Sequence, residues 1–312
     1  MSLRSLTVGL GMALVLILAL AAGSGRPATR VIVTPGFTSD GRPTDLWLAV
    51  LRRRLDPATF DSVARIIHPL ADDEGRWSDT IRAHAVHWAD EVPALMAPFS
   101  PIEAPDSMIV VVGNRGSEDA FTHDSLTIGL DLSALLRVYG PVDGGDNPQK
   151  LDRFFRHEFS HTLQKRWLAR HPYQVRTPLD GALLDIWLEG LGNYYSLGPK
   201  WQPIDGKPSP AADSALARLG PVLVDRLSAL ACADSQKAGP LLKGLSSGPF
   251  DRKWGAVSAA LWLQDEVTRS KGALRSFVAA GPAGVWPLAA RHLSREQGAG
   301  LETARRRDSS CH

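Results

Sequence analysis

Three residues in a five-residue stretch, His157, Glu158 and His161, have the types and the spacing of a metal-dependent hydrolase. On a helix, residues four positions apart lie on one face, so the two imidazoles can reach the same ion. Glu158 lies about 100° around the helix from His157, so it is poorly placed as a ligand but can hold a metal-bound water. This H-E-x-x-H pattern predicts a zinc site with two histidine ligands and a general base.

The surrounding sequence predicts a helix that can present the motif. Asn147 and Pro148 are residue types favoured at an N-cap and at the first helical position. No glycine or proline occurs from Lys150 to Leu168. Apolar side chains recur on a stripe beside the two histidines, at Leu151, Phe155 and Phe159. We therefore expect a helix with a buried face next to a metal-binding face.

A catalytic zinc normally has three protein ligands and one open position, so a third ligand must come from elsewhere in the chain. The best candidate is Glu189, an acid among apolar residues in a second predicted helix at 183–195. Burying a lone carboxylate is costly unless a cation compensates it. If Glu189 were not the ligand, Asp180, Asp185 or a further histidine would have to serve. Gly190 and Gly192, close to Glu189, would let a neighbouring helix approach closely.

Together with the downstream Trp-Leu-Glu-Gly segment, the motif resembles the gluzincins over roughly residues 107–196, and is most similar to bacterial families of predicted zinc-dependent peptidases. The resemblance implies an α+β, zincin-like fold: a small mixed or antiparallel sheet packed on the H-E-x-x-H helix, followed by a mainly helical C-terminal subdomain. It implies one zinc ion per chain. In thermolysin-like members an aspartate four residues after the ligand glutamate supports a zinc histidine. This chain has Asn193 there, and Asp185 is an alternative carboxylate.

A tyrosine or histidine donor often assists zinc in stabilising the oxyanion of the tetrahedral intermediate. The sequence offers four candidates for this role: Tyr194, Tyr195, His123 and His171.

The composition is that of an ordinary globular protein, with a formal net charge of +2. This balance gives no reason to expect a nucleic-acid partner. The basic runs 52–54 and 305–307 are short, and we expect them to be solvated. The partner that the motif indicates is a peptide or protein substrate.

The N-terminus has the pattern of a signal peptide, predicted at residues 1–24. Arg4 supplies a positive region, Leu6–Leu20 is apolar, and small residues follow. Cleavage would leave an exported protein, periplasmic or secreted, with no stable membrane insertion; an uncleaved signal anchor is the alternative. Cys232 and Cys311 could pair in an oxidising compartment, or remain a buried thiol and a thiol in a loose tail.

The rest of the pattern predicts a catalytic region at 25–198, a helical subdomain at 199–304 and a disordered tail at 305–312. Strands are expected at 30–34, 62–67, 107–112 and 126–132. The last strand alternates apolar and small or polar residues, so it should be half-buried. The resemblance to zincins implies that it is an antiparallel edge lining the cleft. Such an edge either binds an extended peptide or is a plain edge protected by Asp131.

The sequence thus favours an exported zinc metallopeptidase. One alternative is a zinc hydrolase that acts on a non-peptide amide. Another is a non-catalytic binding or envelope-assembly protein on a peptidase-like scaffold, against which the intact Glu158 argues, because a scaffold needs no base.

Overall fold

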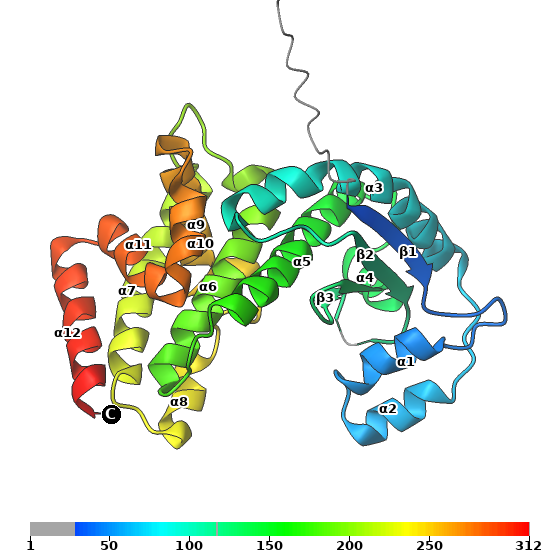
Figure 1. Ribbon diagram of the computed structural model, residues 1–312, viewed down its shortest axis with the longest axis horizontal. Helices are drawn as coiled ribbons and strands as arrows, with labels where there is room; N and C mark the ends of the chain where they lie inside the picture. The colour runs from blue at the N-terminus through cyan, green and yellow to red at the C-terminus, as the bar shows by residue number, and fades with distance from the viewer. Residues whose placement is uncertain (1–28, 117, 312) are drawn as a thin grey trace, which may run out of the picture.

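A small mixed sheet of four strands lies beside a larger body of helices in the computed structural model, which describes residues 29–116 and 118–311 (Figure 1). The strand order is β1-β2-β4-β3. Strands β1, β2 and β4 are parallel, and β3 joins β4 antiparallel at the edge. The strands are β1 (Arg30–Pro35), β2 (Ser107–Gly113), β3 (Ala120–Thr122) and β4 (Thr127–Asp131). The expected α+β class with a small sheet is therefore confirmed.

Strand β4 occupies the segment predicted as a half-buried edge, but it is an interior strand that is buried along its whole length. The small and polar residues of β4 are buried in the interior of the protein and do not face solvent. A Cβ on Gly129 would lie 2.3 Å from the Phe121 ring, so only glycine leaves room for that ring. Asp131 caps the next helix by accepting a hydrogen bond from Ala134 N at 2.7 Å. The antiparallel edge is β3, a three-residue strand that the sequence pattern did not predict.

The strand predicted at 62–67 is wrong. Residues 62–64 are the end of helix α2 (Pro57–Ala64), and residues 65–67 form a turn and an irregular segment after it. Asp56 accepts hydrogen bonds from Ala58 N and Thr59 N at 3.1 Å, and Pro57 takes the first helical position. These start signals outweigh the weak β propensity of the residues that follow.

Four helices position the motif: α3, α4 and α5 contact the sheet, and α6 packs on α5. Helix α3 packs on β1 and on α5, where Trp88 stacks on Phe155 with ring centroids 4.8 Å apart. Helices α5 and α6 run side by side through the middle of the molecule, between the sheet and the C-terminal helices (Figure 1). The four are α3 (Asp72–Met96), α4 (Leu132–Tyr139), α5 (Asn147–Arg170) and α6 (Pro178–Ser196); α1 (Asp45–Arg52) precedes them with α2.

The chain after α6 is helical, as predicted, and packs on α6 mainly through α9. The boundary predicted after residue 198 falls between α6 and α7, and one hydrophobic core continues across it. A smaller cluster lies under α1 and α2. The C-terminal helices are α7 (Pro210–Leu230), α8 (Ser235–Leu242), α9 (Ala256–Arg269), α10 (Ala273–Ala280), α11 (Val285–His292) and α12 (Arg295–Cys311).

The tail differs from its expectation. Residues 305–311, predicted to be disordered, form the last part of α12. Cys311 is joined to Cys232 by a disulfide, and buried Leu301 and Ala304 fix the helix to the core. The covalent bond and this apolar anchor supply the order that the polar composition of the tail did not predict.

The predicted signal peptide lies outside the described residues. Within residues 29–116 and 118–311, every helix is too short or too polar to cross a bilayer.

Candidate metal centre

The structure brings His157 and His161 of α5 together with Glu189 of α6. The two Nε2 atoms are 3.0 Å apart. Glu189 places Oε1 3.4 Å from His161 Nε2 and Oε2 3.6 Å from His157 Nε2. Ligands at about 2.0–2.2 Å from a tetrahedral zinc are about 3.3–3.6 Å from one another. The separations between these nitrogen and oxygen atoms are therefore close to those between the ligands of one zinc ion. Within the described residues, His157, His161 and Glu189 form the one group of three such side chains that could hold a metal ion.

Local sequence explains how α6 presents Glu189. Thr177 caps the helix by accepting from Asp180 N, and the Asp180 carboxylate accepts from Thr177 N in return. A Cβ on Gly190 would lie 2.6 Å from Ala259 Cβ of α9, and a Cβ on Gly192 would lie within 2.9–3.1 Å of the His157 ring. The prediction that these glycines let a neighbouring helix approach closely is confirmed: α9 packs against Gly190, and the His157 side chain of α5 packs against Gly192.

A buried glutamine fixes the orientation of His161. Gln164 donates from Nε2 to Trp187 O at 2.9 Å, so its Oε1, 2.9 Å from His161 Nδ1, must accept from that ring. In its neutral form His161 therefore carries its proton on Nδ1 and can present the Nε2 lone pair to a metal ion. Gln164 lies three residues after His161 on the same helix face, so this partner could have been found from spacing.

A serine plays the same part for His157. Ser196 Oγ donates to Asn193 O at 3.2 Å, and its oxygen lies 3.4 Å from His157 Nδ1, where it can accept. Asn193 and Asp185, the supports considered from the sequence, have other partners. Asn193 donates to Glu189 O at 2.6 Å, and Asp185 accepts from Ser246 Oγ at 2.8 Å. Both imidazoles are thus supported by neutral oxygen acceptors.

The alternative ligands Asp180 and Asp185 are occupied elsewhere, Asp180 at the N-terminus of α6 and Asp185 with Ser246. Of the carboxylates proposed as third ligand, Glu189 is the one that the structure places against the two histidines.

Glu158, the predicted base, is 7% exposed and lies between the histidines and the sheet edge. Thr122 Oγ1 of β3 lies 2.8 Å from both Glu158 Oε2 and Glu158 O and shares its proton between them, and Glu158 Oε1 is 3.9 Å from His157 Nε2. One carboxylate oxygen is therefore fixed while the other faces the ligand side. Burial raises the pKa of Glu158, which moves it towards the range useful for a base that later acts as an acid. Thr122 was missed from the sequence because β3 carries no recognisable strand pattern.

Without a metal, the ligand cluster holds one extra proton. Burial and the charge of His161 lower the pKa of His157 to about 3. Burial also disfavours the charged form of His161, but Glu189 and Glu158 outweigh it and raise the pKa of His161 to about 9. Burial alone would raise the pKa of Glu189, whereas the contact with His161 lowers it to about 2. At neutral pH a proton on His161 thus occupies the position that a metal cation would take.

A cavity of about 1080 Å³ opens over this cluster and is lined by both histidines, Glu158 and Glu189. The four predicted oxyanion donors do not line it. Tyr194 packs on Tyr195, and His171 stacks on Trp167. The polar groups that line it from α6 and from the segment before α9 include Asn193, Ser196, Ser246, Ser247 and Lys253.

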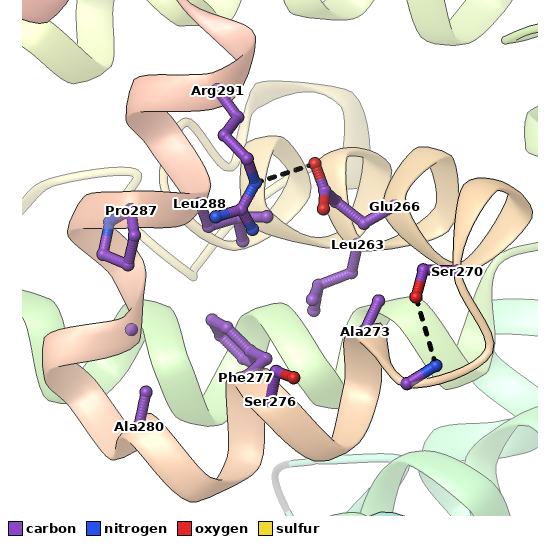
Figure 2. Close-up of a pocket in the computed structure, with 12 residues that line it drawn as sticks. Leu263, Glu266, Ser270, Ala273, Ser276, Phe277, Ala280, Pro287, Leu288 and Arg291 are labelled. Atoms are coloured by element: carbon purple, nitrogen blue, oxygen red, sulfur yellow. Dashed lines mark hydrogen bonds and ion pairs between the residues drawn. The ribbon is translucent and has the colours of Figure 1, made fainter.

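A second cavity, of about 400 Å³, lies between α9, α10 and α11 (Figure 2). Its charged lining residues, Glu266 and Arg291, are paired with each other at 2.9 Å. Buried Phe277 and Leu288 form its floor. The residues that could perform hydrolysis all lie at the larger cavity.

Comparison with protein-family models, with curated proteins and with solved structures finds no match.

Proposed function

We propose that this chain is a zinc-dependent metallopeptidase of the gluzincin type. The observation that carries the proposal is the convergence of three metal-ligating side chains. The Nε2 atoms of His157 and His161 are 3.0 Å apart, and the Glu189 carboxylate places Oε1 3.4 Å from His161 Nε2 and Oε2 3.6 Å from His157 Nε2. Two imidazoles and a carboxylate suit a zinc ion with a free fourth position. The edge strand β3 beside α5 and the helical body that follows support the resemblance to zincins.

The roles of the residues follow from their contacts. His157, His161 and Glu189 would hold the ion, and Gln164 and Ser196 keep the imidazoles in the ligating tautomer. A zinc ion held there would lower the pKa of water and polarise the substrate carbonyl. Glu158 takes the proton from the attacking water on Oε1 and passes it to the leaving amine, while Thr122 holds Oε2.

Two features favour a peptide over a small amide as the substrate. The cavity of about 1080 Å³ is slightly larger than the range of about 300–1,000 Å³ that is typical of small-molecule sites. Phe121 and Thr122 of the edge strand β3 line it, so an extended chain can add to the sheet through backbone hydrogen bonds.

We further propose that the protein is exported, on the strength of Arg4, the apolar run Leu6–Leu20 and the small residues that follow. A disulfide between Cys232 and Cys311 suits an oxidising compartment. Edman sequencing of the protein recovered from the periplasm or medium of an expressing bacterium would locate the cleavage site. A full-length N-terminus retained in the membrane fraction would contradict cleavage.

The catalytic proposal is tested by hydrolysis of a mixed peptide library by zinc-loaded protein, read by mass spectrometry. Wild type should cleave, and Glu158→Gln should lose at least about 10³-fold in kcat while keeping its zinc, because the base is removed and the ligands are not. Glu296→Gln, the same substitution at an exposed position of α12, is the control and should cleave like wild type. Full activity in Glu158→Gln would contradict the mechanism.

A further inference from the structure

Cationic side chains gather on the wall of the metal-site cavity that β3 forms. Arg54 and Lys165 both line the cavity, although one follows α1 and the other lies on α5. The basic run 52–54 was expected to be solvated, but the Arg54 guanidinium lies 4.1 Å above the Phe121 ring and contacts Glu118. An arginine held on an aromatic face is positioned before any ligand arrives.

Lys165 is separated from the proposed base, Glu158, by one residue, Thr122. Lys165 Nζ donates to Thr122 O at 3.2 Å, and Thr122 Oγ1 donates to Glu158 Oε2 at 2.8 Å. A substrate group bound by Lys165 would therefore lie close to the reacting carbonyl, and the residue next to the cleaved bond could provide it.

In the part of the chain that the structure describes, neither cation is held in a buried ion pair, although Glu118, Asp119 and Glu158 line the same cavity. Lys165 forms no ion pair within residues 29–116 and 118–311, and the partner of Arg54, Glu118, is half exposed. Burial lowers the pKa of Lys165. The negative charges of Glu158 and Asp124 raise this pKa, and the positive charges of Arg54 and Arg53 lower it. By contrast, the two cations on the neighbouring wall are neutralised, because Lys150 and Arg153 both pair with Asp146.

We propose that Arg54 and Lys165 form a subsite for a carboxylate of the substrate, adjacent to the scissile bond. The inference rests on the proposed peptidase function and names its substrate class: peptides with an acidic side chain, or a free C-terminus, next to the bond that is cut. Arginine offers a carboxylate two parallel donors and lysine adds a point charge, so the pair gives both orientation and attraction.

The test measures binding in zinc-free protein, so that neither hydrolysis nor a bond from carboxylate to metal contributes. Isothermal titration calorimetry with a chelator present would compare two peptide pairs at low salt. The first pair is Ac-Ala-Leu-Ala-Asp-Leu-Ala-NH2 and its Asn counterpart. The second is Ac-Ala-Leu-Ala-Leu-Ala with a free or an amidated C-terminus. Each is titrated into wild type, Lys165→Met, Arg54→Met and the control Lys271→Met, which changes an exposed lysine outside the cavity.

In wild type and in the control, the acidic member of at least one pair should bind about tenfold more tightly than its neutral partner, as expected for charge-assisted contacts. Lys165→Met and Arg54→Met should each reduce this ratio to about two, and higher salt should reduce it in wild type. A preference in the first pair identifies an acidic side chain, and one in the second identifies a C-terminal carboxylate.

Equal affinities within both pairs would overturn the inference. So would a ratio that neither variant changes, or no measurable binding of any peptide up to about 1 mM. Cleavage of the peptide library without a preference for acidic peptides would refute the subsite alone. A preference for acidic peptides without cleavage of the library would refute the catalytic proposal alone.

Discussion

Replacing Gly192 by alanine should disable the metal site while leaving the fold intact. The added Cβ would lie 2.9 Å from His157 Cε1, 3.0 Å from Nε2 and 3.1 Å from Nδ1. Non-bonded carbon atoms normally stay about 3.5–4.0 Å apart, so the ring must retreat by about 0.5–1 Å. Metal–ligand distances tolerate only about 0.2 Å of error, so zinc binding should suffer far more than folding.

We expect Gly192→Ala to weaken the zinc dissociation constant about 10- to 100-fold, the range seen when the support of a zinc ligand is lost. The thermal stability of the metal-free protein should change little, because alanine favours the helix by about 1 kcal/mol and this offsets the local crowding. Competition with a chromophoric chelator measures the affinity, and circular dichroism measures the fold.

Gly181→Ala is the matched control on the same helix. Its Cβ would meet only Val175 Cγ1, at an ordinary contact distance of 3.6 Å, so zinc affinity should stay at the wild-type value. A folded Gly192→Ala protein that bound zinc within about twofold of wild type would refute the account of how His157 is positioned.

Three further predictions follow from the contacts around the site. Thr122→Val removes the hydroxyl that holds Glu158, so kcat should fall about tenfold with zinc content unchanged; an unchanged kcat would remove Thr122 from the mechanism. Zinc must displace the proton of His161, whose pKa is about 9 in the metal-free protein, so the zinc association constant should rise about tenfold per pH unit between about pH 7 and 9 and then level off. A flat profile in chelator competition across that range would contradict this protonation. Replacing Cys232 and Cys311 by serine opens a loop with a sequence separation of 79 and should lower the unfolding free energy by up to about 4 kcal/mol, measured by urea denaturation, while zinc affinity stays constant. Loss of zinc in that variant would mean that the tail supports the site.

The grouping of the candidate metal ligands could be predicted from the sequence because a helix fixes the spacing of its own side chains. His157 and His161 face the same way wherever α5 lies, and Glu189 was marked by its apolar neighbours. Gln164 followed the same helical period and could have been added to the prediction.

The groups contributed by the sheet edge could not be predicted in this way. Thr122 lies in a strand of three residues, too short for any periodic signal, and it meets Glu158 only after β3 pairs with β4. Arg54 reaches the cavity because α1 and α2 pack on the same face of the sheet as Phe121. The prediction for 62–67 failed for a different reason, because the local start signal at Asp56 and Pro57, which the sequence does contain, was overlooked.

The central claim is that His157, His161 and Glu189 together hold one zinc ion. The most direct test is the zinc content of purified, folded protein by mass spectrometry, for wild type, Glu189→Ala and the control Asp185→Ala, an acid one turn earlier on α6. The account predicts about one zinc per chain in wild type and in the control, and loss of most of it in Glu189→Ala. A folded wild type that takes up no zinc when the metal is supplied, or a Glu189→Ala protein that binds it as tightly as wild type, would contradict the account.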